Sequence, residues 1–159
     1  MKGVGRRGFF GAFGALAANK TVRTRPPYAA DETLFGTECP SCSGVCGTVC
    51  EEAIIKFGED RIPYLDFSES GCSDCGECLK ACERGVLGNP DVFIKGSIRI
   101  NAAKCVSWHQ VMCFSCKEPC LENAIVFENM FRPEISSDVC TLCGYCIARC
   151  PAGAIEVTA

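Results

Sequence analysis

The sequence lacks the groups on which most enzymes depend. Its only histidine is His109, and it has no nucleophile motif, no phosphate-binding loop and no G-x-G-x-x-G fingerprint. These absences exclude the common nucleophilic and nucleotide-dependent classes of enzyme. We therefore expect a protein that is not an enzyme.

Long apolar stretches are also missing. The uncharged run GFFGAFGALAA near the start has only eleven residues, too few to span a bilayer. Cysteine inflates the hydrophobic content of 48%, since 16 of the 159 residues are cysteines. Two sub-domains of about 60 residues with so little aliphatic material bury too little surface to be stable alone. Something other than a core must hold this chain together.

The cysteines are the abundant feature, and they occur in four tight groups. Disulfide frameworks tend to spread their cysteines along the chain, whereas metal sites cluster them. Each group here has four members and closes with a gap of three residues, which favours metal ligation over disulfides. The groups are Cys39, Cys42, Cys46, Cys50; Cys72, Cys75, Cys78, Cys82; Cys105, Cys113, Cys116, Cys120; and Cys140, Cys143, Cys146, Cys150.

The spacing distinguishes zinc from an iron-sulfur cluster. Structural zinc sites usually draw two pairs of ligands from two separate knuckles. A C-x2-C-x2-C run instead places three sulfurs around one loop, which suits a cubane whose iron corners each need one thiolate. The second and fourth groups carry the full C-x2-C-x2-C-x3-C signature of bacterial ferredoxins. We therefore predict 4Fe-4S clusters, most simply four of them.

The groups lie within an internal repeat. Closing cysteines recur at 50, 82, 120 and 150, each followed by a polar step and an apolar pair. Each repeat predicts a strand, a cluster loop, one or two turns of helix and another strand. The stretches AIIKFGEDRIPYLDF and AIVFENMFRPEIS predict hairpins that link repeats 1 to 2 and 3 to 4. The stretch GNPDVFIKG has no tight reversal and indicates a boundary near Gly96.

This organisation resembles two bacterial two-cluster ferredoxins in tandem. The resemblance implies an α+β fold of short hairpins and small helices, with one unit over residues 31–96 and a second over 97–159, preceded by a basic arm over 1–30. In that family the closing cysteine ligates the other cluster of a pair. The implied ligand sets are Cys39, Cys42, Cys46 with Cys82; Cys72, Cys75, Cys78 with Cys50; Cys105, Cys113, Cys116 with Cys150; and Cys140, Cys143, Cys146 with Cys120.

Two groups depart from the family spacing. The first has gaps of two, three and three, and the third has gaps of seven, two and three, which makes Cys105 the least regular ligand. Only Cys150 is followed by the proline of the family pattern, Pro151. His109 lies in the seven-residue gap, where we interpret it as a loop residue over the cluster or in solvent, the alternative being that it tunes the third cluster.

A narrower resemblance rests on three features. The stretch RPPYAADETLF, the form CVSWHQVMCFSCKEPCLENAI of the third group and the single final Cys-Pro are similar to the NapF-type ferredoxins. That resemblance implies a cytoplasmic iron-sulfur protein that contacts the catalytic subunit of the periplasmic nitrate reductase before export and assists its maturation or electron supply. Two alternatives are an exported polyferredoxin wire between a quinol-oxidising module and a periplasmic reductase, and a chaperone whose clusters are only structural.

Charge is unevenly distributed along the chain. Residues 1–30 carry six basic side chains and no acid, whereas residues 31–159 carry ten basic and nineteen acidic ones, a formal net of −9. Nucleic acid is therefore not an expected partner.

Arg6 and Arg7 followed by the short apolar run resemble a twin-arginine export signal. We favour a retained arm that contacts a partner or a membrane surface, with export and a functionless tail as alternatives.

Overall fold

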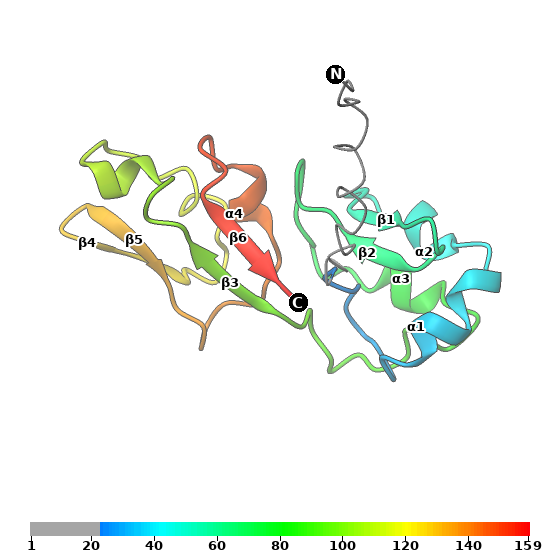
Figure 1. Ribbon diagram of the computed structural model, residues 1–159. Helices are drawn as coiled ribbons and strands as arrows, with labels where there is room; N and C mark the ends of the chain where they lie inside the picture. Colours follow the sequence, from blue (N-terminus) through cyan, green and yellow to red (C-terminus); the bar gives the residue numbers. More distant parts are fainter. Residues whose placement is uncertain (1–22) are drawn as a thin grey trace, which may run out of the picture.

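The computed structural model describes residues 23–159, in which every helix and strand is short (Figure 1). This mixture agrees with the expected α+β class. None of the helices in this range has the length and apolar character that crossing a membrane requires. The elements are α1 (Leu34–Thr37), the 3-10 turn η1 (Cys39–Ser41), α2 (Val45–Thr48), β1 (Ile55–Phe57), β2 (Pro63–Leu65), α3 (Glu77–Lys80), β3 (Ser97–Ile100), the 3-10 turn η2 (Val106–His109), β4 (Ile125–Glu128), β5 (Phe131–Ile135), α4 (Tyr145–Ala148) and β6 (Ile155–Thr158).

Antiparallel pairs make up the sheets of the described residues. β1 pairs with β2, with Ile55 opposite Leu65. β4 pairs with β5, with Ile125 opposite Ile135. Both pairs are the predicted hairpins, which the structure confirms. The third pair joins β3 to β6, with Ile98 opposite Val157, and so brings the two ends of residues 97–159 together.

A similar closure is found in the first half of the chain, residues 23–96. Ala29 forms an isolated antiparallel bridge with Leu87 on the other side of the first two cysteine groups. Tyr28 and Ala29 are both buried in the same apolar cluster as Phe35 and Ile54. The last residues that we assigned to the basic arm thus pack against this half. The twin-arginine-like segment lies outside the described residues.

Each half has a small apolar core into which cysteines are built. The larger core includes Phe35, Val86 and Leu87, with Cys78 among its buried members. The smaller core consists of Ile125, Ile155, Cys116 and Cys146. Both cores are modest because short strands supply few inward-facing side chains. The cysteine sulfurs therefore occupy much of the interior that aliphatic side chains fill in other small domains.

The third cysteine group departs from the predicted repeat. We expected a helix after its cluster loop, and that prediction is wrong: residues 115–119 form consecutive turns, with the Lys117 and Glu118 amides bonded to the Phe114 carbonyl. The reason is Pro119, which lacks the N–H that would continue a helix and disfavours helical conformation at Glu118. A 3-10 turn, η2, occupies the seven-residue gap instead.

The two halves contact each other directly, and Figure 1 shows them side by side. Residues 67–72 of the first half meet residues 142–147 of the second, and we call this the inter-half contact. Its shortest hydrogen bond runs from the Cys72 amide to the Cys143 carbonyl, 2.6 Å. Leu142 and Ile147 of the second half also pack against the apolar core of the first.

Candidate iron-sulfur sites

Four cavities in the described residues are each lined by four cysteines. Each quartet contains three cysteines of one group and the closing cysteine of the neighbouring group. We call the cavities sites 1 to 4 in the order of their groups. Site 1 is lined by Cys39, Cys42, Cys46 and Cys82; site 2 by Cys72, Cys75, Cys78 and Cys50; site 3 by Cys105, Cys113, Cys116 and Cys150; and site 4 by Cys140, Cys143, Cys146 and Cys120.

The structure thus brings together all sixteen cysteines, in the four sets that the two-cluster ferredoxin pattern implies. Within residues 23–159, no three His, Cys, Asp or Glu side chains are positioned to hold a single metal ion. Four separated thiols around a shared cavity fit the corners of a cubane, each of which takes one thiolate.

Short helices in the first, second and fourth groups, and consecutive turns in the third, carry the closing cysteines to the neighbouring sites. In site 2, Gly76 adopts a left-handed backbone (φ 74°) and begins α3 at Glu77. α3 carries Cys78 into site 2, while Cys82, one turn further, reaches site 1. Glycine suits this position because it tolerates positive φ without strain. α2 and α4 begin after left-handed glycines in the same way.

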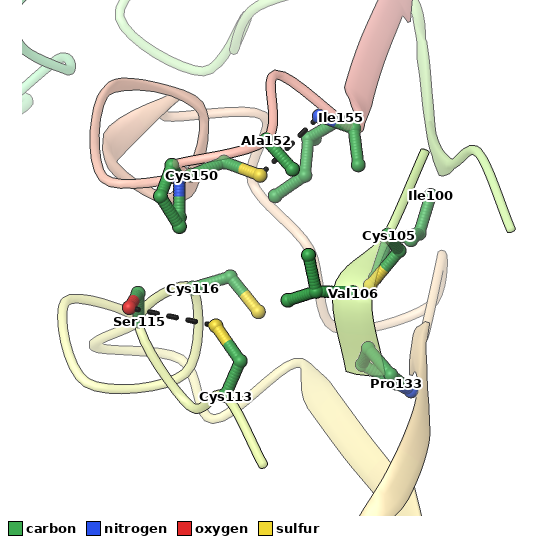
Figure 2. Close-up of a pocket in the computed structure, with 12 residues that line it drawn as sticks. Ile100, Cys105, Val106, Cys113, Ser115, Cys116, Pro133, Cys150, Ala152 and Ile155 are labelled. Carbon is green, nitrogen blue, oxygen red and sulfur yellow. Dashed lines mark hydrogen bonds between the residues drawn. The ribbon is translucent and has the colours of Figure 1, made fainter. Parts of the chain in front are cut away.

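Site 3 shows how the irregular third group still forms a quartet (Figure 2). Cys105 precedes η2, and the turn brings the chain back so that Cys113 and Cys116 face the same cavity. Cys150 lies on the side of the cavity opposite Cys113 and Cys116. Apart from Ser115 the remaining lining is apolar, with Ile100, Val106, Pro133 and Ile155 among its residues. The seven-residue gap therefore does not remove Cys105 from the site.

His109 does not line site 3. Its side chain is exposed and its Nε2 lies 3.2 Å from the Ala103 carbonyl oxygen. Its neighbour Trp108 donates a hydrogen bond from Nε1 to the Pro133 carbonyl over 3.3 Å. η2 is thus fixed by Trp108, and His109 is a loop residue facing solvent, in agreement with our main interpretation.

Several of the cysteine thiols resist ionisation. Burial, reinforced by the neighbouring cysteines, raises the pKa of Cys78 and of Cys146 to about 12. Burial also raises the pKa of Cys39 to about 11, with Cys46 and Cys42 adding to the effect and the Arg25 charge opposing it. Because a metal binds the thiolate, positive iron must offset the cost of ionising these buried groups.

Backbone amides donate hydrogen bonds to two of the closing cysteines. The Leu87 amide lies 3.3 Å from Cys82 Sγ, and the Ala154 amide lies 3.3 Å from Cys150 Sγ. Figure 2 shows the second of these bonds. Hydrogen bonds to ligating sulfur raise the reduction potential of a cluster because they stabilise its more negative, reduced form. These donors could not be recognised from sequence, since a backbone amide carries no signature in the side chains.

Charged side chains near the cysteines differ between sites. Arg61 donates a hydrogen bond to the Cys42 carbonyl in site 1 over 2.8 Å. At site 2 the Tyr28 hydroxyl donates to the Asp74 carboxylate, and burial followed by this contact raises the pKa of Tyr28. Neither pair could be recognised from sequence, because their partners are 19 and 46 residues apart.

Comparison with known proteins agrees with this chemistry. Residues 133–156, which contain the fourth cysteine group, match the family model of a 4Fe-4S binding domain. The chain is 31% identical to the ferredoxin-type protein NapF of Escherichia coli (strain K12), over 82% of each chain. It is also 31% identical to NapF of Haemophilus influenzae, over 95% of this chain and 89% of that one. The ferredoxin-type protein NapG of E. coli is 27% identical over 81% of this chain and 66% of its own.

Proposed function

Because the chain belongs to the NapF family of ferredoxin-type proteins, we propose that sites 1 to 4 each bind one 4Fe-4S cluster and that the protein transfers electrons rather than catalysing a reaction of its own. The observation that carries the proposal is the set of four cysteine quartets, each completed by the closing cysteine of a neighbouring group. Clusters bound there would exchange single electrons.

The proposal includes two tandem two-cluster ferredoxin units, residues 31–96 and 97–159. Three correspondences between the halves support it. Each half has a hairpin between its two cysteine groups, β1–β2 and β4–β5. Each is closed by a pairing of its first and last extended segments. Each has an amide bond to its second closing cysteine, from Leu87 and from Ala154.

The chain's own residues determine what the clusters can do. The mostly apolar linings of sites 2, 3 and 4 exclude water, which lowers the reduction potential, while amides and cations near the sulfurs raise it. The acidic surface of residues 31–159, with a formal net of −9, favours partners with positively charged surfaces. Thiolate ligation adds further negative charge to the same region.

We further propose that the partner is the catalytic subunit of the periplasmic nitrate reductase, contacted in the cytoplasm before export. This part rests on the NapF resemblance, in which such proteins assist maturation of or electron supply to that subunit. The paired arginines Arg6 and Arg7 support the alternative of an exported electron wire. The arm is also proposed to make a peripheral contact with a partner or a membrane.

A capture experiment under anaerobic conditions tests the proposal. The tagged chain is expressed together with the catalytic subunit. The catalytic subunit is made in two matched forms, one that carries its export signal and one that lacks it. We expect capture of the signal-bearing form from the cytoplasmic fraction, together with about sixteen iron atoms per chain. Recovery of a processed chain in the periplasm would support the wire instead. A natively folded chain that binds no iron would contradict both.

A further inference from the structure

The inter-half contact is unusually close at the level of the backbone. A Cβ atom added to Gly71 would lie 2.5 Å from the Tyr145 nitrogen and 2.7 Å from the Cys143 carbonyl oxygen. A Cβ added to Gly144 would lie 2.2 Å from Cδ1 of Phe67. Real Cβ atoms do not approach other atoms so closely, so glycine on each side permits the contact.

Side chains from both halves complete the inter-half contact. Glu52 of the first half accepts a hydrogen bond from the Tyr145 hydroxyl of the second over 2.9 Å. The other oxygen of Glu52 accepts from Ser70, which lies beside Gly71. Phe67 is buried, with 6% of its surface exposed. Polar and apolar interactions thus fix the same few residues, which is typical of a specific docked geometry.

The position of this contact relative to the cysteines is informative. Its central hydrogen bond runs from the amide of Cys72, which lines site 2, to the carbonyl of Cys143, which lines site 4. Within each half, one helical turn or loop separates the cysteines of the two sites, as with Cys78 and Cys82. Sites 2 and 4 are therefore adjacent across the halves, whereas no residue that lines site 1 or site 3 belongs to the contact.

We propose that the inter-half contact makes the four sites one continuous electron path, in the order site 1, site 2, site 4, site 3, with the Cys72–Cys143 hydrogen bond as the link between the halves. This inference rests on the proposed binding of clusters at these sites. Electron transfer slows steeply as the distance between redox centres grows. Two halves joined only by the segment 89–96 would hold two independent pairs of clusters, whereas docked halves carry an electron through the whole molecule.

The two ends of the proposed path both reach the surface. Site 1 is lined in part by Glu83 and Arg84, polar residues accessible to a partner. Beside site 3, Val111 and Met112 have 55% and 65% of their surface exposed. The path therefore has a polar end and an apolar end, and two different redox partners can engage it.

Magnetic interaction between sites 2 and 4 tests the link. The double variant Cys42→Ala, Cys113→Ala removes one ligand each from sites 1 and 3, leaving complete quartets only at sites 2 and 4. After anaerobic reconstitution and reduction, we expect about eight iron atoms per chain and electron paramagnetic resonance signals broadened by mutual coupling. Gly71→Ala added to this background should remove the broadening without lowering the iron content. Gly36→Ala is the matched control, because a Cβ there meets nothing within 4 Å.

Unbroadened signals from a chain with both clusters would overturn the path and leave the proposed function intact. Absence of iron from a folded chain would instead refute the proposed function. A second measurement needs no variant: the Cys72 amide in the four-cluster protein should exchange its hydrogen at least about five-fold more slowly than in an unfolded peptide, because a formed hydrogen bond contributes about 1 kcal/mol. Exchange at the peptide rate in iron-replete protein would also overturn the path.

Discussion

Arg61 donates a hydrogen bond of 2.8 Å to the carbonyl oxygen of Cys42, and so holds a positive charge beside site 1. Arg25 adds a second cation near Cys39 in the same site. Positive charge stabilises the reduced, more negative form of a cluster. The geometry therefore ranks site 1 as the more easily reduced of the two sites in the first half, since Asp74 carries negative charge beside site 2.

Replacing Arg61 should lower the reduction potential of site 1. We expect Arg61→Gln to shift that potential downward by on the order of tens of millivolts, because a solvent-exposed unit charge several ångströms away contributes about 1 kcal/mol. Redox titration followed by electron paramagnetic resonance measures the shift. Lys95→Gln is the control of equal charge change, since Lys95 pairs with Glu32 on the surface, 3.2 Å away. Equal shifts in both variants would contradict the prediction.

Because each closing cysteine lines the site of the neighbouring group, replacing it should remove the cluster of that neighbouring site. Cys82→Ala should abolish the cluster of site 1 and leave site 2 largely unchanged, whereas Cys50→Ala should do the reverse. In each variant iron should fall from about sixteen to about twelve atoms per chain. Resolved spectra of the two variants decide which site is lost. If Cys82→Ala removes the cluster held by Cys72, the tandem-pair arrangement is wrong.

Cys105 should be a ligand of site 3 in spite of its seven-residue gap. We expect Cys105→Ala to lower the iron content by about four atoms per chain, because Cys113, Cys116 and Cys150 supply only three of the four thiolates. His109→Ala, in the same loop but exposed, should change neither the iron content nor the spectrum. Full iron content in Cys105→Ala would show that another group completes site 3.

Tertiary structure should depend on the clusters. The apolar cores are small and contain cysteines such as Cys78 and Cys116, so removal of iron leaves little to hold each half together. Where binding occurs only in the folded state, binding energy contributes directly to folding. We expect anaerobic chelation of iron to abolish the near-ultraviolet circular dichroism of the chain. A spectrum unchanged after complete iron removal is the opposing outcome.

Local features of this fold were predictable because cysteine spacing and strand patterns are local properties. The hairpins β1–β2 and β4–β5 could be recognised from apolar runs around polar turns. The missing helix in the third group was also encoded locally, by Pro119, although the repeat pattern indicates a helix at that place. The four quartets followed only from resemblance to two-cluster ferredoxins, not from spacing alone.

The inter-half contact could not be predicted from sequence. Gly71 and Gly144 look like ordinary loop glycines, and their role depends on which backbone lies opposite each of them. Glu52 and Tyr145 are 93 residues apart, and neither belongs to a motif. The Leu87 and Ala154 amides are equally invisible, because any residue other than proline offers the same N–H.

The pairing of β3 with β6 has a consequence for how the protein is made. The contacts that residues 23–96 make among themselves extend no further than Lys95, which pairs with Glu32, so the first half can fold while the rest of the chain is still being synthesised. The second half requires Cys150 for site 3 and residues up to Thr158 for β6. Sites 1 and 2 can therefore receive iron on the ribosome, whereas site 3 must wait until nearly all of these residues have emerged from it.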